Sequence, residues 1–142
     1  MVLTDDFYNK VRLLLHRINT LKERQEELMA SLEKSTVYLT DLPRSTSPKD
    51  KLVDGLSTLG ELEEKEREAR LELEYLRLQA EEEIEVLTDP TQQLVMRMRY
   101  IDGMKWKKIA GALHYSEDHC FKIHRIAKRT VNNSINNDIM LP

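Results

Sequence analysis

The sequence predicts an all-α protein, and three observations support this fold class. Charged residues make up 33% of the 142 residues and aromatic residues only 6%, a composition typical of helices with solvated faces. Apolar residues recur at helical spacing over two long segments, and no segment alternates apolar and polar residues as a half-buried strand does. We therefore expect a long antiparallel helical hairpin or coiled coil in residues 1–87, followed by a smaller helical domain in residues 88–142.

The first predicted helix begins after Thr4, a favourable N-cap, and runs to about Glu33. Its apolar residues follow alternating steps of four and three, interrupted by Gln25, as in the seam of a coiled coil. A polar residue at one seam position is a known way to set register or partner. The seam, which we expect to close the hairpin or a dimer, consists of Phe7, Val11, Leu14, Ile18, Leu21, Leu28 and Leu32.

Residues 35–48 contain two prolines and several Ser and Thr residues, and they are predicted to be a connector. A second helix, capped by Ser47, should begin near Pro48 and reach Leu87, a length of about 60 Å at about 1.5 Å per residue. Neither helix can bury its apolar stripe alone, which favours the hairpin. The alternative is a single long, partly frayed helix.

A third helix is predicted to begin at Asp89, which caps it, with Pro90 in the first position and Gln92 completing a capping-box-like pair. Gly103 should end it. Its inner side is predicted to carry Leu94, Val95, Met98 and Ile101.

The pattern of residues 105–133 predicts a helix-turn-helix. The two helices of this motif meet at a steep angle, so the first needs a small residue at the crossing, and Ala110 has the right position. Ser116 should cap the second helix, and His114 should take a left-handed conformation in the turn. The Asn-rich tail after Val131 is expected to be loosely held. The motif's apolar positions are Ile109, Leu113, Tyr115, Cys120 and Ile123.

The charge distribution points to double-stranded DNA as the partner. Residues 1–87 hold 13 Lys/Arg and 20 Asp/Glu, a net of −7, whereas residues 88–142 hold 9 and 5, a net of +4. The outer face of the second helix of the motif is predicted to read bases through Glu117, Asp118, Phe121, Lys122 and Arg125. Phosphate contacts are expected from Lys105, Lys107, Lys108, Ser116, Lys128 and Arg129.

The acidic residues at the start of this helix have two interpretations that the sequence leaves open. Glu117 and Asp118 favour the positive end of the helix dipole, and Asp118 can orient Lys122 one turn further on. Alternatively, a carboxylate can accept a hydrogen bond from the amino group of cytosine and reject other bases.

Metal binding and catalysis are not expected. Cys120 and His124 have a spacing that suits a shared metal ion, but the motif places Cys120 on the core face, and further ligands are missing. No nucleophile–base pair, paired catalytic carboxylates or phosphate loop appears, so we expect neither an enzyme nor a cofactor. No apolar run approaches the roughly 20 residues that span a bilayer, and no secretory signal is recognisable, which favours a soluble cytoplasmic protein.

The segments "VMRMRYIDG" and "GMKWKKIAGALHYSEDHCFKIHRIA" resemble the helix-turn-helix of sigma-factor domain four. They resemble more closely the sigma-like late-gene activators of phages of Gram-positive bacteria, the ArpU/RinA group, which "DLPRSTSPKD" followed by a long charged helix also resembles. The resemblance implies a transcriptional activator of late phage genes in the cytoplasm of the bacterial host. It would act with host RNA polymerase, and residues 1–87 would provide dimerisation or polymerase contact.

The resemblance has limits at the residues expected to approach the bases. Sigma factors usually carry Arg, Glu, Arg and Gln where this chain has Glu117, Asp118, Phe121 and Lys122, so a sigma-type promoter element is not implied. Two other functions remain open. A phage small terminase subunit also joins a helix-turn-helix to coiled-coil helices, and a helical adaptor would use the same corner to bind protein.

Overall fold

The computed structural model describes residues 1–39 and 46–140, and within them it contains five α-helices and no β-strand. This confirms the all-α class. None of the described helices is both long and apolar enough to cross a membrane. The helices are α1 (Asp5–Leu39), α2 (Thr46–Ile84), α3 (Pro90–Tyr100), α4 (Trp106–Leu113) and α5 (Glu117–Met140).

The chain divides into two compact units, and α1 and α2 each run through both. Unit 1 comprises Met1–Leu15 and Leu73–Pro142, and unit 2 comprises His16–Glu72. Unit 1 therefore contains the start of α1, the end of α2 and all of α3, α4 and α5.

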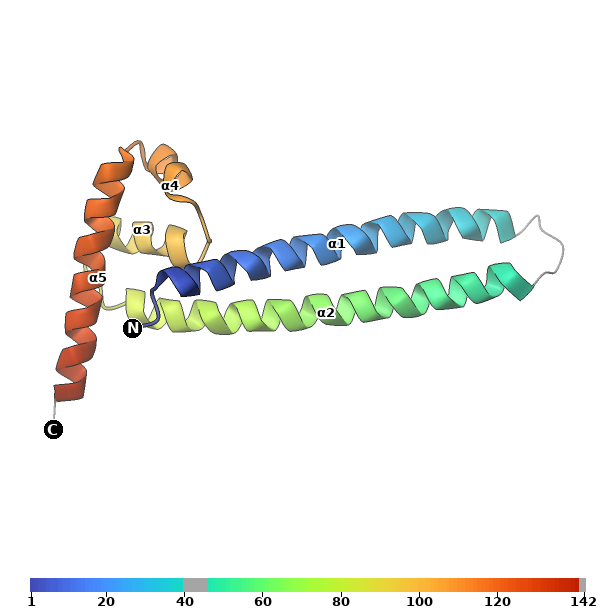
Figure 1. Ribbon diagram of the computed structural model, residues 1–142, viewed down its shortest axis with the longest axis horizontal. Coiled ribbons are helices and arrows are strands. Elements are labelled where there is room, and N and C mark those ends of the chain that lie inside the picture. The colour runs from blue at the N-terminus through green and yellow to red at the C-terminus, as the bar shows by residue number, and fades with distance from the viewer. Residues whose placement is uncertain (40–45, 141–142) are drawn as a thin grey trace. The chain divides into compact units, whose positions relative to one another are not determined.

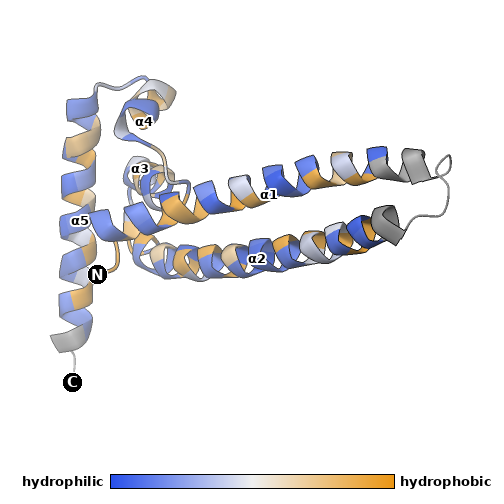
Figure 2. Ribbon diagram, turned by 45° about the vertical axis from the view of Figure 1, so that its right-hand side comes forward, coloured by the Kyte–Doolittle hydropathy of each residue, from blue (hydrophilic) through white to orange (hydrophobic). Residues whose placement is uncertain are grey.

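In unit 2, the segments of α1 and α2 lie side by side and run in opposite directions (Figure 1). Gln25, the polar residue of the predicted seam, donates a hydrogen bond from Nε2 to the carbonyl of Leu62 at 3.4 Å. A Cβ atom at Gly55 would lie 2.5 Å from Cδ2 of Leu32, so glycine lets this leucine reach the backbone of α2. Along both helices, hydrophobic residues alternate with hydrophilic ones (Figure 2).

The residues of the predicted seam are covered within the single chain. Within unit 1, Phe7, Val11 and Leu14 are buried, and within unit 2, Ile18 and Leu21 are buried. Leu28 and Leu32 in unit 2 are half-buried. In the described structure, the seam therefore serves the packing of the chain itself.

Several helix boundaries differ from those expected. Helix α1 continues to Leu39 rather than ending near Glu33, because residues 35–39 contain neither Gly nor Pro to stop it. Helix α2 begins at Thr46, so Ser47 lies in its first turn, where Pro48 is tolerated because the first amides have no partner inside the helix. Both ends of the predicted connector 35–48 are thus helical, and its middle, residues 40–45, lies outside the described residues. Helix α2 ends at Ile84, three residues before the predicted end.

Unit 1 is held together by apolar packing and by hydrogen bonds between its segments. The carboxylate of Glu83 near the end of α2 accepts hydrogen bonds from the backbone amides of Val2, at 2.6 and 2.9 Å, and Leu3, at 3.3 Å. Arg77 donates from Nε to the carbonyl of Ile101 at 3.1 Å. The largest fully buried side chains of this unit are Leu3, Val11, Ile84, Leu87, Val95, Met96, Tyr100, Ile109, Cys120 and Val131.

Two expectations for unit 1 were wrong. The inner side of α3 carries Val95 and the fully buried Met96, whereas Leu94 is 43% exposed, because the helix packs with a different face than its pattern indicated. The Asn-rich segment after Val131 is helical through Met140, because α5 continues without a break beyond Val131, which is itself fully buried. In the described structure, α5 is therefore more than twice as long as α3.

Candidate nucleic-acid interface

The turn between α4 and α5 has the conformation that its sequence predicts. His114 has φ 57° and ψ 37°, which confirms the left-handed residue, and the backbone amide of Tyr115 donates to the carbonyl of Ala110 at 3.0 Å. Ser116 Oγ accepts a hydrogen bond from the amide of His119 at 3.1 Å, which confirms it as the cap of α5. These local contacts set the direction in which α5 leaves the turn.

Small and apolar side chains fill the contact between α4 and α5. Ile109, Ala110 and Cys120 form a buried cluster, and Ile123 is buried one turn further along α5. Ala110 is 5% exposed and lies in this cluster beside Cys120 of α5. Tyr115, by contrast, is 39% exposed and packs edge-on against the ring of His119. Partly buried residues complete the cluster, namely Met98, Met104, Trp106 and Leu113.

The face of α5 opposite this cluster is polar and exposed. The predicted base-reading residues Glu117, Asp118, Lys122 and Arg125 are all exposed. Phe121 is also exposed, and one side of its ring packs edge-on against Trp106 with the centroids 5.3 Å apart. This contact leaves only part of the Phe121 ring available to a ligand.

The residues predicted to contact phosphates lie on both helices. Lys105, Lys107 and Lys108 are exposed around the start of α4, and Arg129 is exposed on α5. Lys128 is half-buried. Ser116 is exposed, although its hydroxyl oxygen already accepts the capping hydrogen bond.

Ion pairs do not neutralise this basic surface in the described part of the chain. Ion pairs of unit 1 join the N-terminal amine to Glu83, Arg77 to Glu74 and Arg97 to Glu81, and none of these residues belongs to α4 or α5. Lys122 is four residues from Asp118, but the two side chains form no ion pair there. Lys122 and Arg125 can therefore meet an anion without first losing a carboxylate partner.

A buried arginine beneath the site was not predicted from the sequence. The guanidinium of Arg99 on α3 lies 3.3 Å from the ring centroid of Tyr8 and 4.6 Å from that of Trp106. Its Nη1 donates to the carbonyl of Met104 at 3.1 Å, and burial lowers its pKa below the ordinary value. Arg99 thus contacts the loop before α4 through the carbonyl of Met104 and packs against the ring of Trp106. The two arginines at 97 and 99 in "MRMRY" gave no sign of which one is buried.

A tyrosine and a histidine link α3 to α5. The hydroxyl of Tyr100 and Nε2 of His124 form a hydrogen bond of 2.7 Å, and their rings are stacked with the centroids 5.8 Å apart. Burial, followed by the positive charge of Lys128, lowers the pKa of His124 to about 4, so its ring is neutral at pH 7. Burial raises the pKa of Tyr100 to about 12. His124 is half-buried and serves as a packing residue between the helices of unit 1.

Cys120 is fully buried, and burial raises the pKa of its thiol. A buried neutral thiol behaves as a small apolar side chain rather than as a ligand. Among the described residues, no group of three or more His, Cys, Asp or Glu side chains is placed to hold a metal ion.

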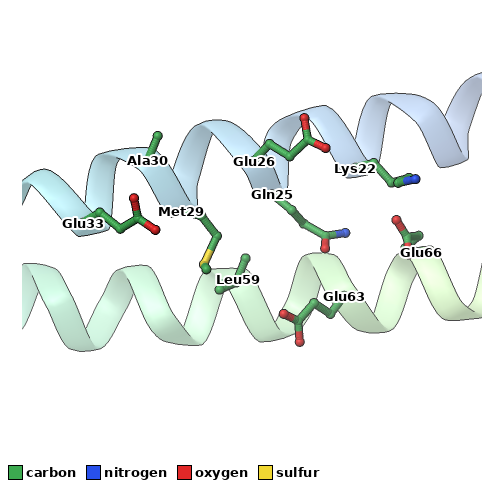
Figure 3. Close-up of a pocket in the computed structure, with 9 residues that line it drawn as sticks. All are labelled: Lys22, Gln25, Glu26, Met29, Ala30, Glu33, Leu59, Glu63 and Glu66. Carbon is green, nitrogen blue, oxygen red and sulfur yellow. The ribbon is translucent and has the colours of Figure 1, made fainter.

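Unit 2 has a surface groove of different character, about 520 Å³ in volume. Met29 of α1 and Leu59 of α2 point toward one another there (Figure 3). The lining has one lysine, Lys22, and four glutamates, so its potential disfavours a polyanion. The exposed basic residues of α4 and α5 are therefore the better candidates for contact with nucleic acid. The four glutamates are Glu26, Glu33, Glu63 and Glu66.

Residues 45–132 match the sequence model of the DUF1492 family, whose description is "protein of unknown function". No curated protein and no solved structure matches the chain. The matched range includes the described part of α2, all of α3 and α4, and α5 as far as one residue beyond Val131.

Proposed function

We propose that the chain, which belongs to the DUF1492 family, is a sequence-specific DNA-binding regulator of transcription. In this proposal α4 and α5 act as a helix-turn-helix, and α5 is the helix that enters the major groove. The resemblance to the sigma-like activators favours a more specific role, the activation of late phage genes together with host RNA polymerase. No metal or cofactor takes part in the proposed activity.

One observation carries the proposal. The left-handed turn at His114, the cap at Ser116 and the small Ala110 hold two short-linked helices so that one face of α5 is buried and the opposite face is exposed. That exposed face carries Lys122 and Arg125 within the first three turns of α5, where a recognition helix contacts base edges.

The electrostatics support a polyanionic partner. Residues 88–142 carry a net charge of +4 although the whole chain is acidic. Each lysine or arginine that neutralises a phosphate releases condensed counterions, which favours association at low salt. His124 does not add to this charge at neutral pH, because its pKa of about 4 leaves the ring neutral.

The exposed residues divide into two proposed roles. Lys122 and Arg125 would donate hydrogen bonds to guanine edges, and the open edge of Phe121 would meet a thymine methyl group. Lys107 and Lys108 at the start of α4 would contact phosphates and set the position of α5 in the groove. Glu117 and Asp118 keep both of their proposed roles, helix stabilisation and selection of cytosine.

Selection from a pool of random duplex DNA tests the proposal directly. The full-length protein should enrich a common short sequence over successive rounds at moderate salt, because direct base contacts discriminate by about 1–3 kcal/mol each. An unenriched final pool would overturn sequence-specific binding. The terminase alternative predicts a large ring, which a mass measurement in solution distinguishes from a small assembly, and the adaptor alternative predicts no DNA binding at low salt.

A further inference from the structure

Helix α2 has two apolar faces, and the described part of the chain covers only one of them. Leu62, Ala69, Leu73 and Ala80 are buried on the inner face. At about 100° per residue, a second set of apolar residues projects from the opposite side of the helix. Each of its members is between 54% and 66% exposed: Val53, Leu56, Leu71, Tyr75 and Leu78.

The second face is continuous along the helix. Between Leu56 and Leu71, the same side of the helix is continued by Gly60, Glu64 and Arg67, which are exposed. We call the complete set the outer stripe of α2. It consists of Val53, Leu56, Gly60, Glu64, Arg67, Leu71, Tyr75 and Leu78.

The separations between successive residues of the outer stripe form the same series when read from either end of the helix. Successive members are separated by 3, 4, 4, 3, 4, 4 and 3 residues. A two-fold axis between Lys65 and Glu66 would therefore bring each member of the stripe in one copy opposite a member in a second, antiparallel copy. This reciprocity is what a two-fold interface requires, because the same patch serves both subunits.

The residues that this axis pairs are chemically complementary. Val53 of one copy meets Leu78 of the other, and Leu56 meets Tyr75, so both ends of the stripe are apolar. Gly60 meets Leu71, a small residue against a large one, and a Cβ atom at Gly60 would meet no described atom within 4 Å apart from its chain neighbours and the adjacent backbone of its own helix. The leucine of a second copy can thus lie close to the backbone of α2.

The centre of the stripe carries opposite charges. Glu64 and Arg67 form an exposed ion pair within α2, and the two-fold axis places Glu64 of one copy beside Arg67 of the other. The four charges would then alternate in sign at the middle of the interface. The proposed register is the one that places both Glu64–Arg67 pairs together across the axis, so these charges favour it over shifted registers.

We propose that the outer stripe of α2 is the surface through which two copies of this chain form an antiparallel dimer. Five apolar side chains of this size, each more than half exposed, present roughly 100 Å² apiece. A symmetric pair would therefore bury roughly 1,000 Å², the area at which specific interfaces begin. The proposal goes beyond DNA binding and does not depend on it, because the dimer is measured without DNA.

The mass of the full-length protein in solution tests the proposal. Sedimentation equilibrium should give twice the chain mass of 16.7 kDa. The double variant Leu71→Glu/Leu78→Glu should sediment as a monomer while keeping its helical circular dichroism, because both side chains are exposed in the single chain. Leu13→Glu is the matched control, since Leu13 is a 68% exposed leucine on α1, outside the stripe, and this variant should remain a dimer.

Charge reversal provides a second readout that leaves the apolar residues unchanged. Glu64→Arg places four cations at the two-fold axis, and Arg67→Glu places four anions there, so either single variant should weaken dimerisation at least about tenfold. The combined variant Glu64→Arg/Arg67→Glu restores the alternation and should dimerise like the wild type. If the combined variant folds but dimerises no better than the single variants, the proposed pairing at the centre of the stripe is contradicted.

Disulfide crosslinking tests the orientation. Val53→Cys/Leu78→Cys should form covalent dimers on oxidation, whereas Val53→Cys alone and Leu78→Cys alone should not, because equal positions lie far apart in an antiparallel pair. The buried Cys120 should not crosslink in the wild type. A monomeric wild type, an assembly larger than a dimer, or crosslinking of either single variant would overturn the proposal.

Discussion

The hydroxyl of Tyr100 lies 2.7 Å from Nε2 of His124, and this hydrogen bond ties α3 to the helix that carries the proposed base-reading residues. Trp106 of α4 packs edge-on against the same histidine, with the ring centroids 4.7 Å apart. Three helices therefore meet at His124. The orientation of α5 depends on these contacts as well as on the turn that precedes it.

The Tyr100→Phe substitution removes the hydrogen bond and keeps the ring. It should lower the free energy of unfolding by about 1 kcal/mol, measured by urea denaturation, because Nε2 of the half-buried His124 loses its hydrogen-bond partner. Tyr8→Phe is the matched control. The Tyr8 hydroxyl is buried and has no hydrogen-bond partner in the described part of the chain, so its removal should leave stability unchanged or raise it. Equal losses in the two variants would contradict the assignment.

Acidification should destabilise the protein through His124. Its pKa is about 4 in the folded chain and about 6.5 when unfolded, so between these values only the unfolded state binds the proton. The free energy of unfolding is therefore unaffected by protonation of His124 above pH 6.5 and decreases as the pH falls from 6.5 toward 4. The loss should amount to about 1–2 kcal/mol, less than the full shift implies because solvent reaches part of the ring.

A variant series isolates this effect from other titrating groups. His124→Phe should remove this part of the pH dependence of the free energy of unfolding, whereas His16→Gln at an exposed position of α1 should retain it. Denaturation at constant ionic strength between pH 4 and 8 makes the comparison. An unchanged slope in His124→Phe would show that other groups cause the loss.

Ala110 should tolerate no larger side chain. It is buried in the cluster with Ile109 and Cys120 where α4 and α5 meet, so Ala110→Leu should destabilise the protein by about 1–3 kcal/mol. Ala112→Leu, two residues away on the exposed side of α4, should change stability by less than about 0.5 kcal/mol. Thermal denaturation compares the two variants, and similar melting temperatures would argue against a close crossing at Ala110.

Substitutions of the proposed base-reading residues should reduce the preference for the selected DNA, whereas substitution of a phosphate-contacting lysine should not. Lys122→Ala or Arg125→Ala should weaken binding to the selected DNA by about 1–3 kcal/mol and have less effect on random DNA. Lys107→Ala should weaken binding to both DNAs alike. Titrations by fluorescence anisotropy with both duplexes make the comparison, and equal losses for Arg125→Ala would remove this residue from the base-reading set.

The sequence was most informative where structure depends on neighbouring residues. The left-handed residue at His114 and the caps at Asp89 and Ser116 follow from local rules and were predicted correctly. The all-α class follows from periodicity, which reports the preferred repeat of long segments.

The errors arose where the outcome depends on distant parts of the chain. Periodicity does not say which of two apolar faces meets a partner, so Leu94 was expected inside α3 in place of Met96. The burial of Arg99 depends on Tyr8, which is 91 residues away in the sequence. The polar composition of the segment after Val131 suggested a loose end, whereas α5 continues as a helix through it.

The salt dependence of duplex binding by the full-length protein tests the central claim most directly. Affinity measured between 50 and 200 mM salt should fall steeply and linearly on logarithmic axes, with a slope of about −0.9 for each phosphate that the protein contacts. The double variant Lys122→Glu/Arg125→Glu should bind far more weakly and with a shallower slope. A wild-type protein that binds no duplex DNA at 50 mM salt, or that binds with the same affinity as this variant, would contradict the proposed function.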